Sequence, residues 1–356
     1  MKLNPHFRSA DEVETPGNLR DLCGWSDQVD PIESDLIDTE QRVFGELVEE
    51  SPATFTERIA RTPLDAMFER WTQFQADKGR YAGSADWSLL DEFAHGSPLV
   101  WFPQIIGSCV VSNTFRRWVD RLTYQIVFLG ESMEHLGRNE SGPENYSPYG
   151  PFWYGLARQK ANMRRGDGLY AGPMVWAMMQ GALRSDDERL AGILQRAGLN
   201  AASDFPEPQG RDGAELYRRF GRHEFVNELK PRIQYPLGES LDVTSADQLW
   251  DLLQAGKPSF KCSMEAIHKV GEHPDGFAIH ARNRRDSWAH NMSFAGCFIS
   301  SDGERWFRES NESWGAQHIY NRAFDEVDRA FRGGGLTVRA IGEIEGPESQ
   351  PPQFAA

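Results

Sequence analysis

The chain has 356 residues, among them 11 Trp and 21 Phe, and its formal net charge at pH 7 is −15. This length can bury one large core or two smaller ones without metal or disulfide support, and the aromatic content is typical of a packed globular protein. The acidic balance disfavours binding to nucleic acid or to an anionic membrane surface, because both require basic patches.

The spacing of the cysteines and the length of the apolar runs indicate where the protein is located and whether it binds a metal or cofactor. The four cysteines, at positions 23, 109, 262 and 297, lie far apart and lack the Cys-x-x-Cys spacing, so we expect neither a metal nor a cofactor. The N-terminus lacks the hydrophobic region of a secretory signal, and no apolar run approaches the roughly 20 residues of a membrane-spanning helix. A cytoplasmic protein is the resulting expectation.

The first 95 residues are predicted to form a partly helical N-terminal extension, either a pro-segment or a docking element. Residues 1–35 are polar and look irregular, whereas two helices are expected between residues 38 and 79. Thr62 is placed to cap the second helix, with Pro63 at its first position. The apolar stripe of this helix comprises Leu64, Met67, Phe68, Trp71 and Phe74.

The longest helix is predicted directly after residue 108. Apolar residues recur with helical spacing from Val111 to Ile126, so a buried amphipathic helix is expected to begin at Cys109. Residues 137–172 are rich in Gly, Pro, Tyr and Asn, and we expect them to form long ordered loops.

Two further helices complete the first half of the chain. One is predicted over residues 172–183. The other is expected to start at the capping box formed by Ser185 and Glu188 and to end at Gly198.

The second half changes from helical to strand patterns. Ser245 with Gln248 is predicted to cap a short helix that ends at Gly256. Alternating apolar residues predict strands over 260–264 and 292–298, a hairpin turn at 301–303, a last strand over 336–344 and a flexible tail over 346–356. A helical half followed by a strand half predicts an α+β domain over residues 96–345, with a cleft between its parts at about 96–200 and 230–345.

Three short segments in a fixed order carry thiol chemistry. Cys109 lies in the first turn of the long helix, where unpaired backbone N–H groups favour the thiolate. His290 opens a strand-like run, and Asn311 and Glu312 follow a hairpin. A nucleophile, a base and a residue that orients the base are the components of a cysteine hydrolase. We expect the other three cysteines to be inert and His268, His273 and His280 to lie at the surface.

These segments resemble the papain-like cysteine peptidases over roughly residues 95 to 345. Gly107-Ser108-Cys109 is similar to the nucleophile segment of that family, and Ala289-His290-Asn291 is similar to its base segment. Ser313-Trp314-Gly315 is similar to its Asn-Ser-Trp-Gly signature, and the stretch from Gly168 to Trp176 resembles its substrate wall.

The resemblance implies a fold, a reaction and a set of site residues. A helical subdomain with the nucleophile would pack against an antiparallel β-sheet or barrel subdomain, with the active site in the cleft between them. Cys109 would attack an amide carbonyl and His290 would transfer the proton, while Gln104 and a backbone N–H would hold the oxyanion. The resemblance places Gly172, Trp176 and Trp314 in substrate binding.

The sequence departs from the family pattern at four points. Val110 stands where the family has Trp, and Gln104 lies one residue closer to the nucleophile than usual. The 181 residues from Cys109 to His290 exceed the roughly 130 to 150 expected between the nucleophile and the later triad members. An ungapped match puts Glu312 rather than Asn311 in the orienting position, and either side chain is able to hold an imidazole. We favour Asn311, with a one-residue insertion after it.

Three functional hypotheses follow. The first is a hydrolase, a thiol protease that acts on a polypeptide. The second is a papain-like scaffold without peptidase activity, such as a structural protein of a bacteriophage virion that binds another structural protein. The third is a different Cys-His amidase or a transglutaminase-like enzyme. No nucleic-acid or membrane partner is expected.

Overall fold

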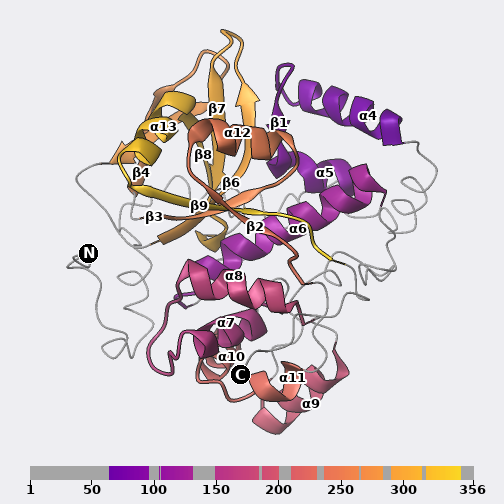
Figure 1. Cartoon of the computed structure of the whole chain (residues 1–356), viewed down its shortest axis with the longest axis vertical. Coiled ribbons are helices and arrows are strands. Elements are labelled where there is room, and N and C mark those ends of the chain that lie inside the picture. The colour runs from indigo at the N-terminus through magenta and orange to yellow at the C-terminus, as the bar shows by residue number, and fades with distance from the viewer. Residues whose placement is uncertain are drawn as a thin grey trace.

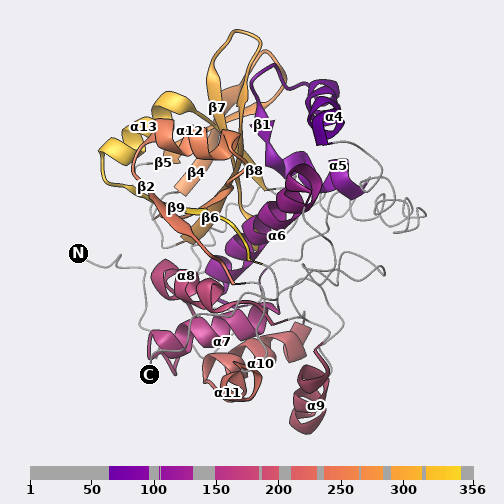
Figure 2. The same cartoon turned by 45° about the vertical axis from the view of Figure 1, so that its right-hand side comes forward.

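The computed structural model describes residues 64–95, 104, 106–130, 149–183, 187–199, 210–230, 236–263, 266–283, 290–314 and 318–345. These residues form an α+β fold, which confirms the predicted class. Helix α6 (Cys109–Leu129) lies between a β-sheet on one side and a group of helices on the other in both Figure 1 and Figure 2. The predicted helix between residues 38 and 63 and the tail over 346–356 lie outside the described residues.

The described strands form one nine-stranded sheet with the order β2-β9-β3-β6-β7-β8-β5-β4, and β1 pairs with β6. The pairs are antiparallel except for the pair of β5 with β8. The strands are β1 (Ala85–Asp86), β2 (Ser240–Val243), β3 (Ser259–Ser263), β4 (Ala266–Glu272), β5 (Ala278–Asn283), β6 (His290–Ile299), β7 (Arg305–Ser310), β8 (Ile319–Ala323) and β9 (Leu336–Ile341).

Helix α6 contributes to two hydrophobic cores. Phe115 and Trp118 pack in the core of the helical side, whereas Val127 and Phe128 pack in the core of the sheet side. The helical side contains α7 (Gly150–Lys160), α8 (Ala171–Gln180), α9 (Glu188–Ala197), α10 (Gly210–Gly221) and α11 (Val226–Leu229). The sheet side contains α4 (Leu64–Asp77), η2 (Trp87–Leu89), α5 (Leu90–His95), α12 (Ala246–Gln254) and α13 (Phe324–Arg332). Because α6 is buried in both cores, its N-terminus is held firmly between the two parts.

Several predicted helix ends are confirmed. Helix α6 begins at Cys109, and α12 is capped by Ser245, whose Oγ accepts the backbone N–H of Gln248 at 3.1 Å. Gly198 ends α9 with a φ of 67°, a left-handed conformation that glycine adopts without strain. Gly256 follows α12 with a φ of 70° and packs so closely on the Tyr124 ring that a Cβ there would lie 2.2 Å from it.

Other local predictions are wrong. Residues 150–160, expected to be a loop, form α7, because Pro151 suits the first turn of a helix and the apolar residues after it are buried. Asp187 rather than Ser185 caps α9, with Asp187 Oδ1 accepting the backbone N–H of Arg189 at 2.9 Å. The last strand ends at Ile341 instead of 344.

The described part of the N-terminal extension belongs to the sheet-side core. Met67, Trp71 and Trp87 are buried there, and the two tryptophan rings stack with centroids 5.3 Å apart, although Phe68 of the predicted stripe stays 43% exposed. Strand β1 also pairs directly with β6. A truncation that tests for a pro-segment therefore has to end before Leu64, since a cut at residue 95 would remove part of this core.

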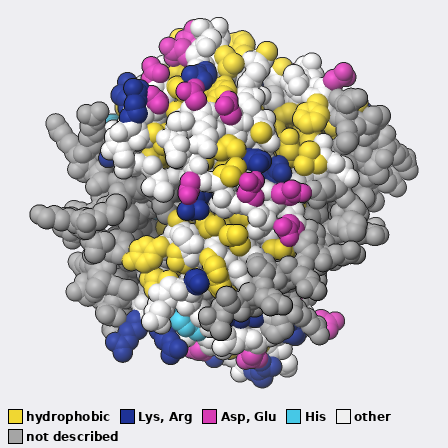
Figure 3. Space-filling model, viewed as in Figure 1, with side chains coloured by type: hydrophobic (Ala, Val, Ile, Leu, Met, Phe, Trp, Pro, Cys, Tyr) yellow, Lys and Arg dark blue, Asp and Glu magenta, His cyan; other side chains and the backbone are white. Residues whose placement is uncertain are grey.

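One face of the molecule shows how its charged side chains are distributed. Acidic and basic side chains are interspersed on the face shown in Figure 3, so its described part has no broad field of one sign. Among the described helices, none combines the length and the apolar character that crossing a bilayer requires.

Candidate active site

Cys109 is the first residue of α6, and the turn before it is tightly closed. Ser108 is the N-cap residue, and its backbone N–H donates to the carbonyl of Ile106 at 2.7 Å. The start of a helix carries unpaired N–H groups and the positive end of the helix dipole, and both favour a negative charge there. Cys109 is 9% exposed. The local structure therefore places the thiol where a thiolate is stabilised.

His290 and Asn311 are joined by a hydrogen bond. His290 is the first residue of β6, and Asn311 directly follows the neighbouring strand β7. The distance from His290 Nε2 to Asn311 Oδ1 is 2.9 Å, and both side chains are buried. An amide oxygen only accepts hydrogen bonds, so this contact selects the tautomer with the proton on Nε2. Nδ1 is then the nitrogen without a proton, which is able to accept one.

Ser313 is part of the same hydrogen-bonded group. Its Oγ donates to Asn311 Oδ1 at 2.6 Å and lies 3.2 Å from His290 Nε2. The backbone N–H of Asn311 donates to the carbonyl of His318 at 2.9 Å, which closes the loop between β7 and β8. The loop geometry thus holds the amide of Asn311 against the imidazole.

The structure distinguishes between the two possible orienting residues. Asn311 contacts the imidazole, whereas the carboxylate of Glu312 turns to α6 and lies 2.9 Å from Nη2 of Arg117. Asn311 directly precedes the 3-10 helix that Glu312 begins, and the two side chains leave this turn toward different partners, so Asn311 is the one that reaches His290.

Gln104 lies beside the loop that bears Asn311, and Asn291 lies close to the start of α6. The backbone N–H of Gln104 donates to the carbonyl of Ser313 at 2.8 Å. The amide nitrogen of Asn113 bonds both to the carbonyl of Cys109, at 3.0 Å, and to the carbonyl of Asn291, at 2.8 Å. The side-chain nitrogen of Asn113 therefore connects Cys109 with Asn291, the residue after His290.

The predicted substrate-wall segment also lies beside the nucleophile segment. A Cβ on Gly107 would be 2.8 Å from the backbone nitrogen of Gly168. The buried guanidinium of Arg158 fixes this loop, since it donates to the carbonyls of Gly168 at 2.6 Å, Arg165 at 2.7 Å and Gly166 at 2.9 Å. The close approach of the two backbones requires glycine at position 107.

For the three residues that were predicted to bind substrate, the contacts described do not include Cys109 or His290. Gly172 is exposed in the first turn of α8. Trp176 packs partly against the helical-side core, and Nζ of Lys160 lies 4.9 Å from its ring centroid. Trp314 ends the short 3-10 helix η5 (Glu312–Trp314), directly after the loop that contacts His290. The structure therefore places Trp176 in a packing contact and leaves a substrate role for these three residues as a prediction.

Gly107→Ala is expected to lower the free energy of unfolding by about 1–3 kcal/mol, because the added methyl overpacks a backbone contact. Gly172→Ala is the matched control, since a Cβ at Gly172 meets no atom within 4 Å. Urea unfolding of both variants checks the difference. Equal stabilities of the two variants would contradict the close contact between Gly107 and Gly168.

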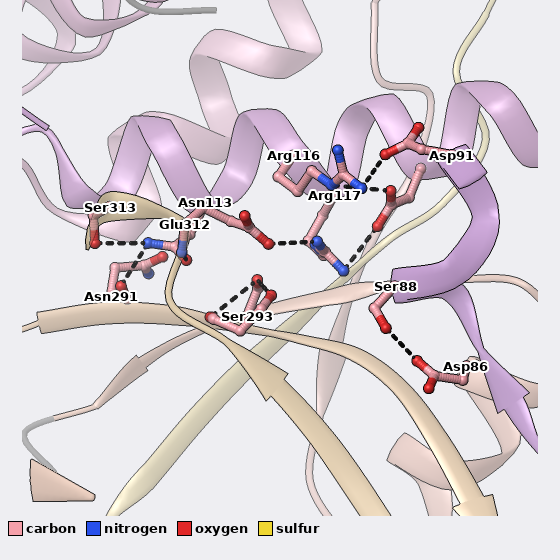
Figure 4. Close-up of polar contacts among 12 residues, drawn as sticks. Asp86, Ser88, Asp91, Asn113, Arg116, Arg117, Asn291, Ser293, Glu312 and Ser313 are labelled. Atoms are coloured by element: carbon pink, nitrogen blue, oxygen red, sulfur yellow. Dashed lines mark hydrogen bonds and ion pairs between the residues drawn. The ribbon is translucent and has the colours of Figure 1, made fainter. Parts of the chain in front are cut away.

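A buried group of five charged side chains lies behind the loop that bears Asn311. Arg117 contacts Asp120 at 2.7 Å in addition to Glu312, and Arg116 contacts Asp91 and Asp120 (Figure 4). Three carboxyl groups thus share two guanidinium groups. Burial raises the pKa of Asp120 to about 7, although Arg117 and Arg116 act in the opposite direction. We call these five residues the buried charge cluster.

Cys297 was expected to be inert, and His268, His273 and His280 were expected to lie at the surface. Burial raises the pKa of the Cys297 thiol in β6, so it stays protonated. His273 and His280 are buried, which corrects the prediction of surface positions; the exposed His268 fits it. Nδ1 of His280 accepts the backbone N–H of Asn321 at 3.2 Å, and burial lowers the pKa of His280 to about 4.

One group of described side chains has the spacing of a metal site. His273, Asp302 and Glu304 each place a potential ligand atom within 4.8 Å of the others. Nε2 of His273 already lies 3.3 Å from the carboxylate of Asp302, and both acidic residues are exposed. A hydrogen-bonded turn accounts for this cluster, and we assign no metal to it.

Sequence reasoning missed Asn113, Arg117 and the role of Ser313. The signal was present in the spacing, because Asn113 and Arg117 follow Cys109 at intervals of four residues along a helix that was predicted to be buried. Residues four apart lie on one face of a helix, so these polar side chains had to meet a polar partner in the interior.

The comparisons with known proteins give no family. A scan against protein-family models and a search of curated proteins both found no match to this chain. Any functional conclusion therefore rests on the geometry of the site.

Proposed function

We propose that this protein is a papain-like cysteine hydrolase, a peptidase that cleaves amide bonds through Cys109, His290 and Asn311. The observation that carries the proposal is the 2.9 Å hydrogen bond from His290 to Asn311 beside the helix that begins with Cys109. A thiol at a helix start and an imidazole with a fixed tautomer are the two elements of an activated cysteine nucleophile.

In the proposed reaction, Nδ1 of His290 takes the proton of the Cys109 thiol, and the thiolate attacks the carbonyl carbon of the scissile amide. The backbone N–H of Cys109 and the side chain of Gln104 donate to the oxyanion that forms. When the C–N bond breaks, the imidazolium gives its proton to the leaving amine, and a thioester remains. Water then attacks the thioester with His290 as base, which releases the acid and restores the thiol.

Asn311 and Ser313 support the base in this reaction. Asn311 keeps the Nε2 proton of His290 in place, so Nδ1 accepts and returns the proton without a change of tautomer. Ser313 donates to the same oxygen of Asn311 and limits the rotation of the amide. The Asn rather than the Glu of this loop therefore completes the proposed triad.

The pH dependence of Cys109 alkylation by iodoacetamide tests the proposal. Rapid alkylation near pH 6 is expected, because an imidazolium beside the helix start lowers the pKa of a thiol below its ordinary value of about 8.5. Mass spectrometry identifies the labelled residue, and buried Cys297 is the internal reference. In His290→Ala the alkylation at pH 6 is expected to collapse. Alkylation of the parent only above about pH 8 would count against the proposal.

A second candidate function is a papain-like scaffold without peptidase activity, for example a virion component. The low exposure of Cys109, 9%, and Val110 in place of the family's Trp favour it. In that case the thiol would not react near pH 6, and the protein would co-purify with capsid or tail proteins. An activated Cys109 together with hydrolysis of peptides excludes this alternative.

A further inference from the structure

Asn113 is a completely buried amide at the centre of the site. It lies one helical turn after Cys109 on α6, and its exposed fraction is 0%. Its side-chain nitrogen donates to the carbonyl of Cys109 at 3.0 Å, to the carbonyl of Asn291 at 2.8 Å and to Oγ of Ser313 at 3.3 Å. Its oxygen accepts the backbone N–H of Glu312 at 3.0 Å.

These contacts use the full capacity of the amide. An NH2 group has two hydrogens, so the three acceptors share them, and the bond to Ser313 is the longest. The partners belong to three segments that are distant in the sequence: the start of α6, the start of β6 and the loop after β7. Figure 4 shows the side chain of Asn113 in contact with both Asn291 and Ser313. An apolar residue of the same size would leave a buried N–H and two buried carbonyls without these bonds.

The next turn of α6 holds the same loop at a second point. Arg117 lies four residues after Asn113 and bonds to the carboxylate of Glu312 at 2.9 Å. Glu312 is therefore fixed by its backbone to Asn113 and by its side chain to Arg117. Because Asn311 and Ser313 flank Glu312, both of these neighbours are constrained as well.

We propose that Asn113 is a positioning residue: it holds His290 and Asn311 in the geometry that fixes the imidazole tautomer. This inference deepens the proposed function and takes its catalytic meaning from it. Asn113 itself touches no reacting atom, and it acts through the carbonyl of Asn291, the N–H of Glu312 and the hydroxyl of Ser313. Loss of these bonds is expected to let the loop shift and the imidazole rotate.

Two variants separate the hydrogen bonds of Asn113 from its volume. Asn113→Ala removes all of them and leaves a cavity. Asn113→Asp keeps the shape and the acceptor for the N–H of Glu312, but an ionised carboxylate is unable to donate to the three oxygens. Thr114→Val is the matched control, since Thr114 is equally buried on α6 and its hydroxyl donates to the carbonyl of Val110 of the same helix.

The test measures the tautomer of His290 by 15N NMR of histidine-labelled full-length protein in a Cys109→Ala background. Without the thiol the imidazole has no thiolate partner, so the result does not depend on whether Cys109 is activated. The His290 signals are assigned by their loss in His290→Ala. We expect the Nε2-protonated tautomer in Cys109→Ala and in its Thr114→Val derivative, and a mixture of tautomers in both Asn113 derivatives.

The outcomes decide between three explanations. Loss of the single tautomer in both Asn113 variants supports the inference. Loss only in the Asn113→Ala derivative would assign the effect to the cavity, and loss only in the Asn113→Asp derivative would assign it to the added charge. Either result would overturn the inference, and so would an unchanged tautomer in both derivatives.

Iodoacetamide alkylation of the Asn113 variants with Cys109 intact adds a second measurement. At pH 6 the rate is expected to fall about tenfold or more, which corresponds to one unit or more in the pKa of the thiol. If the parent itself shows no alkylation at pH 6, the proposed function fails, while the NMR result still decides the role of Asn113.

Discussion

Cys109→Ala is expected to lower the rate of peptide hydrolysis by about four to six orders of magnitude, the loss seen when the nucleophile of a catalytic triad is removed. The reason is that no other side chain at the helix start is able to form the thioester. The measurement is the release of labelled peptides from casein under conditions in which the parent and the variant are both folded.

Cys297→Ala is the matched control for this prediction. Cys297 is buried in β6, and its Sγ accepts from the Gln254 amide at 3.4 Å, away from the start of α6. Its removal is expected to leave the rate unchanged. If Cys109→Ala kept the activity of the parent, the hydrolase proposal would be wrong and a different nucleophile would have to be sought.

The parts of the fold that were predicted correctly depend on short-range signals. Helix α6 follows from apolar residues at helical spacing, and the end of α9 at Gly198 follows from the ease with which glycine adopts a positive φ. Ser245 and Gln248 satisfy the N–H groups at the start of α12 locally. Each of these signals is contained within a few neighbouring residues and needs no knowledge of the tertiary fold.

The predictions that failed depend on tertiary packing. The glycines and Pro151 around α7 suggest a loop, but burial of Trp153 and Leu156 in the helical-side core outweighs the weak helix propensity of that segment. Likewise, His280 is polar and was expected at the surface, yet its Nδ1 satisfies the backbone N–H of a neighbouring strand. Such partners are distant in the sequence, so no local pattern identifies them.

The candidate site shows the same division. Cys109, His290 and the loop at 311–313 were found from local motifs, whereas the contacts that distinguish Asn311 from Glu312 are seen only in the three-dimensional structure. Glu312 is directed to Arg117 by an ion pair that spans 195 positions of the chain. The ion pair of Glu312 with Arg117 and the hydrogen bonds of Asn311 together determine which residue faces the imidazole.

Arg117→Met is expected to lower the free energy of unfolding by about 3–5 kcal/mol at pH 8, because it leaves the buried carboxylates of Asp120 and Glu312 without their shared cation. Arg196→Met is the matched control. Its partner is Glu228, both side chains are more than half exposed at 65% and 54%, and the expected loss is below about 1 kcal/mol. Urea unfolding is the suitable measurement, since guanidinium chloride would screen the charges.

The cost of Arg117→Met is expected to depend on pH, and the direction follows from the buried charge cluster. The pKa of Asp120 is about 7 in the folded chain, against 3.8 ordinarily, so the folded chain binds an extra proton between about pH 4 and pH 7. Because this proton is lost as the pH rises across that range, the free energy of unfolding decreases by up to about 1.4 kcal/mol per pH unit. Without Arg117 the pKa of Asp120 rises further, and the fall continues above pH 7. The deficit of Arg117→Met relative to the parent is therefore expected to be larger at pH 8 than at pH 6, and a deficit that is equal at both would show that the cluster holds no such proton.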